Sequence, residues 1–205
     1  PEIAALNARA GTPAWHDATL RLCYPPRTTE MAGRHRLIHT YGWEESVFPH
    51  EHAQAFNARL SMIPSMSRYV SRTLVDSGVG LPLPVAGVGT DHYRELTPEP
   101  EALAGRLPAA DGKMTFLHVS SCFPRKGVDV LLEAWYRAFD QDDGVRLVIK
   151  TFPNPHHRIE ETLADRRRQH PQGAPVVLIN EDLSAGAVRA LYAEAHALVA
   201  PSRGE

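Results

Sequence analysis

Two adjacent cations, Arg125 and Lys126, lie directly before Gly127 and a run of apolar residues with helical spacing. The N-terminus of a helix carries unpaired N–H groups and the positive end of the helix dipole, so it attracts anions. Cations at the same place are unfavourable unless an anion neutralises them. These residues therefore predict a phosphate-binding turn. The alternative is a basic turn that only faces water, because short motifs often occur without a ligand.

Three further polar residues follow apolar runs that we expect to form strands. Lys150 ends the run VRLVIK, so its side chain would point from the carboxyl end of a strand towards a ligand. Alternatively, the charge reaches past the sheet edge into water. Asn180 and Glu181 follow the run PVVLI, and their side chains suit hydrogen bonds to a nucleobase or a ribose. The alternative is that they only begin a loop before a helix capped by Ser184.

Motifs for several other chemistries are missing from the sequence. The eleven histidines form only two clusters, His50-x-His52 and His156-His157, and neither has Cys or carboxylate residues around it at metal-ligand spacing. We therefore predict no metal site. The G-x-S-x-G turn of serine hydrolases, the G-x-G-x-x-G fingerprint and the G-x-x-x-x-G-K-S/T loop are also absent. We predict no bound cofactor.

A regular alternation of strands and helices surrounds the predicted phosphate-binding turn. We expect strands at 114–119, 145–150, 175–179 and 196–200, and helices at 127–139, near 156–168 and at 184–194. The runs LVI and VVLI are continuous rather than alternating, which is typical of strands buried on both faces of a parallel sheet. Right-handed crossovers then give a doubly wound α/β fold, in which ligands bind at the carboxyl ends of the strands.

The first half of the chain has a weaker pattern. We expect strands at 19–24, 34–41 and 59–63, helices at 50–58 and from Ser67 to about Gly78, and an extended segment at 81–88. Residues 97–113 contain three prolines and two glycines but no strand pattern. They predict a linker between a first domain at 1–96 and a second domain at 114–205.

Composition limits the class of protein. The chain has 205 residues, of which 43% are hydrophobic and 22% charged, and its net charge is −2 with His neutral. This charge indicates neither nucleic acid nor an anionic membrane as a partner. Only Cys23 and Cys122 are present, which fits a reducing compartment, and no apolar run approaches the ~20 residues of a membrane span. We expect a cytoplasmic protein without an integral membrane segment, at most peripheral at the inner face of a membrane.

Longer stretches resemble a known family. The segments VSSCFPRKGVDVLLEAW, LVIK and LSAGAVRALYAEAHALVAPSRGE resemble, in order and spacing, the C-terminal domain of GT-B glycosyltransferases of family 4, also called group 1. Residues that match the family motifs LSxxELxxLYxxA and PSxxEGFG are Ser184, Leu191, Tyr192, Ala195, Pro201, Ser202 and Glu205. FNARLSMIPSMSRYVSRTLVDSGV and VAGVGTDHY resemble the later part of the family's N-terminal acceptor domain.

The resemblance implies two Rossmann-like, doubly wound parallel-sheet domains, both incomplete in this chain. It implies sugar transfer from a nucleoside diphosphate sugar to a glycan, lipid or other acceptor, with retention and without a metal ion. Lys126 would bind the donor diphosphate, with Arg125 as a second cation, and Gly127 would give the ligand access to the backbone. Glu205 would contact the transferred sugar. Cations and a helix N-terminus would stabilise charge on the leaving diphosphate.

The resemblance also indicates further candidate residues for substrate binding. On the donor side these are Lys150, Asn180, Glu181 and Ser202. On the acceptor side they are Trp43, Glu44 and Glu45, which follow the second expected strand.

The sequence departs from the family in several places. Ser120-Ser121 stand where the family's turn usually has Gly-Arg, so the diphosphate-binding Arg is absent from its usual position. The second glutamate of the family's Glu-x7-Glu pair would lie beyond residue 205, and the chain begins on a Pro, so we expect a fragment that is inactive by itself. Two other functions fit the same architecture: a module that binds a nucleotide or sugar phosphate without transfer, and a nucleotide-sugar epimerase.

Overall fold

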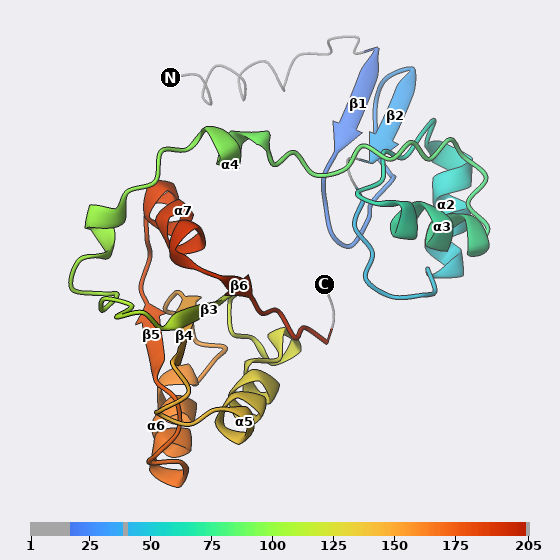
Figure 1. The fold of residues 1–205 in the computed structure, drawn as a ribbon. Helices are drawn as coiled ribbons and strands as arrows, with labels where there is room; N and C mark the ends of the chain where they lie inside the picture. The colour runs from blue at the N-terminus through green and yellow to red at the C-terminus, as the bar shows by residue number, and fades with distance from the viewer. Residues whose placement is uncertain (1–16, 39–40, 204–205) are drawn as a thin grey trace. The chain divides into compact units, whose positions relative to one another are not determined.

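A computed structural model describes residues 17–38 and 41–203 (Figure 1). The chain divides into two compact units, Pro1–Gly89 and Thr90–Glu205. Each unit has its own hydrophobic core.

The first unit contains a short parallel sheet. Strand β1 (Ala18–Arg21) pairs with β2 (His35–Ile38), and helices α2 (His50–Arg59) and α3 (Arg68–Asp76) follow. The predicted N-cap of α3 is confirmed, because the Ser67 hydroxyl accepts a hydrogen bond from the N–H of Val70 at 3.2 Å.

The strand predicted at 59–63 does not form. The backbone there makes only isolated parallel bridges, Leu37↔Met62 and Ser65↔Val85 among them. Pro64, Pro82 and Pro84 lie in the paired segments, and a proline has no N–H to donate to a ladder. In the segment 81–88, the carbonyls of Pro82 and Pro84 accept hydrogen bonds from the N–H groups of Ile63 and Ser65, and Gly87 has a left-handed backbone (φ 69°).

The second unit contains a four-stranded parallel sheet in the order β5-β4-β3-β6. Its strands are β3 (Met114–Val119), β4 (Val145–Thr151), β5 (Val176–Asn180) and β6 (Ala197–Leu198), and its helices are α4 (Asp91–Glu95), α5 (Val128–Ala138), α6 (Ile159–Gln169) and α7 (Ala185–Glu194). The predicted doubly wound α/β sheet is therefore confirmed, and only the last strand is shorter than expected.

The two faces of this sheet have separate cores. Leu147 and Ile149 of β4 pack with residues of α5 and α6, whereas Val148 packs with residues of α7. All seven residues of β4 are buried, as its continuous apolar run predicted.

The segment 97–113, predicted as a linker, packs on the second unit. It contains the 3-10 helix η1 (Pro100–Leu103), which lies against α7. Leu103 is only 4% exposed and shares a core with Leu117 of β3. The compact units divide earlier, after Gly89, so the segment 97–113 belongs to the second unit.

Candidate functional site

The predicted phosphate-binding turn lies at the carboxyl end of β3. Residues Pro124–Lys126 form a 3-10 turn, η2, in which the N–H of Lys126 donates to the carbonyl of Phe123 at 2.8 Å. Gly127 follows with a left-handed backbone (φ 68°), and α5 begins at the next residue. The cations Arg125 and Lys126 thus precede a helix at the sheet edge where doubly wound folds bind ligands.

The segment that follows β6 holds this turn in place. The N–H of Arg203 donates to the carbonyl of Arg125 at 2.7 Å. Its guanidinium donates to the carbonyl of Pro124 and forms an ion pair with both carboxylate oxygens of Asp129, at 2.8 and 3.0 Å. The Arg203 hydrogen bond lowers the pKa of the Asp129 carboxyl. Loops after two different strands are therefore joined into one structure.

Gly127 is required by this arrangement for two reasons. A Cβ atom at this position would lie 2.0 Å from the carbonyl oxygen of Pro201, and the left-handed φ disfavours any side chain. The resemblance gave Gly127 the role of admitting a ligand to the backbone. In the structure the atom that approaches Gly127 is a carbonyl oxygen of the chain itself.

A buried histidine lies beneath the turn, and the sequence patterns did not single it out. His118 of β3 is 1% exposed; its Nδ1 donates to the carbonyl of Val199, and its Nε2 lies 2.8 Å from the hydroxyl of Ser120. The same hydroxyl accepts the N–H of Cys122 at 3.0 Å. Ser120 thus helps to connect the loops after β3 and β6. The signal in the sequence was a polar residue inside the apolar run FLHV.

Lys150 lies at the carboxyl end of β4 and is buried, with 7% of its surface exposed. Its ammonium donates to the carbonyl of Thr151 at 2.8 Å. Burial lowers the pKa of Lys150, and the nearby charges of Asp182 and Glu181 oppose this shift. The alternative in which its charge reaches into water is therefore wrong.

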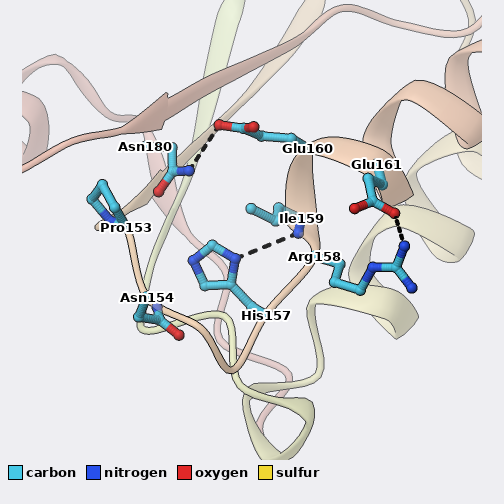
Figure 2. A pocket seen from close by; sticks show the side chains of 8 residues that line it. All are labelled: Pro153, Asn154, His157, Arg158, Ile159, Glu160, Glu161 and Asn180. Atoms are coloured by element: carbon cyan, nitrogen blue, oxygen red, sulfur yellow. Dashed lines mark hydrogen bonds and ion pairs between the residues drawn. The ribbon is translucent and has the colours of Figure 1, made fainter.

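Asn180 lies beside a pocket of about 220 Å³ between the loop after β4 and the end of β5 (Figure 2). Its side-chain Nδ2 donates to Oε1 of Glu160 at 2.8 Å, which fixes the orientation of the amide. The amide oxygen is buried, and no described residue donates to it. His157 lines the same pocket, and its Nε2 lies 3.1 Å from the carbonyl of Phe152. The pocket therefore contains one buried acceptor, the Asn180 amide oxygen, to which no described residue donates.

The remaining donor-side candidates are placed differently. Glu181 forms a half-exposed ion pair with Arg106, at 2.9 Å. Ser202 is partly buried in the segment that holds the turn. Glu205 lies outside the described residues. The structure therefore brings the turn, Lys150, Asn180 and Ser202 to one edge of the second unit, at the ends of four strands.

The acceptor-side candidates lie in the first unit. Trp43 is partly buried: its indole N–H donates to the carbonyl of Val47 at 2.9 Å, and its ring packs edge-on against Phe48. Glu44 and Glu45 are exposed. The packing gives Trp43 a structural role, and an acceptor role for these residues stays a prediction.

Residues 17–38 and 41–203 contain no group of three or more His, Cys, Asp or Glu placed to hold a metal ion. Metal independence stays a prediction of the resemblance. None of the helices in residues 17–38 and 41–203 has the length and apolar character needed to cross a membrane.

No family profile and no curated protein sequence matches the chain. Solved structures do match in fold. The Anabaena protein HepE, in complex with UDP-glucose, has a TM-score of 0.59 and 14% identity over 82% of this chain and 47% of its own. Sucrose-phosphate synthase of Thermosynechococcus elongatus has a TM-score of 0.64 and 14% identity over 98% of this chain and 53% of its own.

A third neighbour is the trehalose 6-phosphate synthase of Burkholderia multivorans, with a TM-score of 0.58 and 14% identity over 82% of this chain and 45% of its own. The chain thus spans about half the length of these proteins. At this identity the likeness concerns architecture alone, and the neighbours are GT-B glycosyltransferases. The fold expected from the sequence is confirmed: the chain has the Rossmann-like α/β fold of the GT-B glycosyltransferases.

Proposed function

We propose that the protein transfers a sugar from a nucleoside diphosphate sugar to an acceptor, with the carboxyl edge of the second unit as the donor site. The observation that carries the proposal is the turn Arg125–Gly127. It presents two cations before α5, at the edge where doubly wound folds bind ligands. The fold shared with HepE, which was solved with UDP-glucose, supports the same ligand class.

The turn would act on the leaving group. When the bond between sugar and diphosphate breaks, negative charge grows on the diphosphate. Lys126 and Arg125 would stabilise that charge, together with the N–H groups of α5. The contacts of Arg203 and Pro201 fix the backbone of the turn, so it needs little rearrangement when charge develops. Arg125 would take the part of the arginine that the family places at Ser121.

The finer features of the proposal come from the resemblance. Transfer would proceed with retention and without a metal ion or cofactor, and the transferred sugar would be a hexose in contact with Glu205. Lys150, Asn180, Glu181 and Ser202 are further donor-side candidates, and the acceptor would be a glycan, a lipid or another compound. The reaction would take place in the cytoplasm.

The proposal is tested first by binding. We expect UDP to bind the chain in isothermal titration calorimetry, and Lys126→Ala to weaken binding at least about tenfold, because a charge-assisted hydrogen bond contributes roughly 1.5–3 kcal/mol. Lys113→Ala is the matched control, since Lys113 precedes the opposite end of β3. An unchanged UDP affinity in Lys126→Ala would contradict the donor site.

Turnover separates the three candidate activities. UDP-glucose is incubated with the full-length protein, with and without a panel of glycan and lipid acceptors, and the products are separated. A transferase forms a new glycoside only when an acceptor is present. Conversion of the nucleotide sugar without an acceptor would instead identify an epimerase, and binding without any turnover would identify a binding module.

A further inference from the structure

A second pocket of about 220 Å³ lies in the second unit, at the amino end of β4. Its walls are mostly apolar side chains of residues 100–110, among them Leu103, Ala104 and Leu107. The exceptions are Arg146, from β4, and Glu194, from the end of α7. The pocket is thus at the opposite end of the strand from Lys150.

Arg146 is an unusual residue for such a wall, because it is only 3% exposed. Its Nε donates to the hydroxyl of Thr115 at 2.8 Å, and its Nη1 donates to the carbonyl of Pro108. Both acceptors are uncharged. Within residues 17–38 and 41–203 no ion pair includes Arg146, and Glu194, which lines the same pocket, is not paired with it.

The guanidinium retains donors for a further partner. It has five N–H bonds, and the two hydrogen bonds use one at Nε and one at Nη1. One N–H of Nη1 and both of Nη2 remain. A buried cation without a counterion is unfavourable, and a carboxylate can accept two parallel hydrogen bonds from one guanidinium.

We propose that this pocket binds a small organic acid with one carboxylate and an apolar body. The carboxylate would accept the remaining N–H groups of Arg146, and the apolar body would lie against Leu103, Ala104 and Leu107. Glu194 disfavours a ligand with two negative charges, such as inorganic phosphate, because like charges repel. The volume is below the usual range for drug-sized ligands, which favours a short chain.

This site is independent of the proposed sugar transfer. None of its residues belongs to the turn Arg125–Gly127 or to the segment that holds it. A ligand there would contact both Arg146 and the segment 100–110, so its binding would fasten that segment to the sheet.

Butyrate is the probe for the test, and its amide, butyramide, is the uncharged control. We expect saturable binding of butyrate to the chain by calorimetry or NMR, with a Kd on the order of 1 mM for so small a ligand. Butyramide and inorganic phosphate should bind at least about tenfold more weakly, because the first lacks the charge and the second meets Glu194.

Variants locate the site. Arg146→Met should weaken butyrate binding at least about tenfold. Ala104→Trp should do the same by filling part of the pocket, since Ala104 is an exposed lining residue and the larger side chain leaves Arg146 in place. Arg106→Met is the matched control, because Arg106 lies in the same segment but pairs with Glu181.

The outcomes decide the proposal. It is overturned if the wild-type chain binds butyrate with no saturation, if butyramide binds equally well, or if Arg106→Met loses as much affinity as the site variants. If Arg146→Met does not fold, Ala104→Trp decides alone: retained wild-type affinity in that variant overturns the site, and lost affinity supports it.

Discussion

Strand β4 carries a buried cation at each end, and the two cations are held differently. Arg146 and Lys150 lie on the same face of the sheet, because side chains alternate along a strand. Arg146 donates to a hydroxyl and a carbonyl, whereas Lys150 donates to the carbonyl of Thr151.

The chemistry of the two groups explains the difference. A guanidinium stays charged in proteins, so the free-energy cost of burying Arg146 can be offset only by hydrogen-bond acceptors around it. An ammonium can lose its proton, and burial lowers the pKa of Lys150 accordingly. The amino edge of the sheet therefore holds a permanent charge, whereas the carboxyl edge holds a titratable one beside the exposed turn at Arg125.

The largest effect is expected at Gly127. Gly127 and Gly144 both have a left-handed backbone, with φ of 68° and 65°, and Gly144 precedes the amino end of β4. Only at Gly127 would a Cβ meet another atom, the carbonyl oxygen of Pro201. Gly144→Ala should cost about 1 kcal/mol of unfolding free energy from backbone strain, and Gly127→Ala about 3 kcal/mol or more.

Urea denaturation of the two glycine variants measures this difference. Calorimetry with UDP adds a second readout, because only Gly127→Ala should also weaken nucleotide binding. Equal losses of stability in the two variants would show that a Cβ atom at residue 127 does not clash with the carbonyl oxygen of Pro201.

The next effect compares the two buried cations. Arg146→Met removes two hydrogen bonds from a charged donor, each contributing roughly 1.5–3 kcal/mol, but it also removes a buried charge. We expect a net loss of about 2 kcal/mol in unfolding free energy. Lys150→Met removes one such hydrogen bond and also a buried positive charge. The unfolding free energy should therefore change by no more than about 1 kcal/mol. Urea denaturation measures both changes. A larger loss of unfolding free energy in Lys150→Met than in Arg146→Met would contradict this expectation.

The pH dependence of stability sharpens the same contrast. The pKa of Lys150 is lowered in the folded chain from its ordinary value of 10.5. Between the folded pKa and 10.5 the unfolded chain therefore binds more protons, so the wild-type protein gains stability as pH rises through this window. Below the pKa that Lys150 has in the folded chain, Lys150 is charged in both the folded and the unfolded chain. The full free-energy cost of burying its charge is then present.

Lys150→Met isolates this effect, because other groups that titrate in the same range are common to both proteins. The difference in unfolding free energy, wild type minus variant, should rise as pH increases from neutrality to 10.5. Arg146→Met is the control and should show a constant difference from wild type over the same range, since a guanidinium does not titrate there. A constant difference for Lys150→Met would contradict the lowered pKa.

The two units also show what sequence patterns can predict. Strand β3 has the bounds that its short apolar run predicted, because such a run is typical of a buried strand. The pairing near Met62 depends on isolated bridges between proline-rich segments, which leave no such pattern. Local patterns therefore predicted the second unit better than the first.

Long-range contacts account for what the sequence did not predict in the sites. The turn at Lys126 was found from its charges, but the contacts that hold it come from Pro201 and Arg203, far along the chain. Arg146 looked like an ordinary member of the run VRLVIK. Its burial depends on the segment 97–113, whose prolines and glycines indicated a linker. The site at the amino edge could therefore be seen only after that segment was placed.

The smallest effect is expected from the ion pair between Asp129 and Arg203. Both side chains are about half exposed, and exposed pairs contribute little to stability. Asp129→Asn should therefore leave the urea midpoint close to wild type and weaken UDP binding about two- to fivefold, because the turn at Lys126 becomes less fixed. The loss should shrink at high salt, which screens exposed charges. Asp142→Asn is the matched control, because Asp142 lies in an exposed turn after α5. A large drop in stability without a change in UDP affinity would make the pair a structural contact and not a support of the donor site.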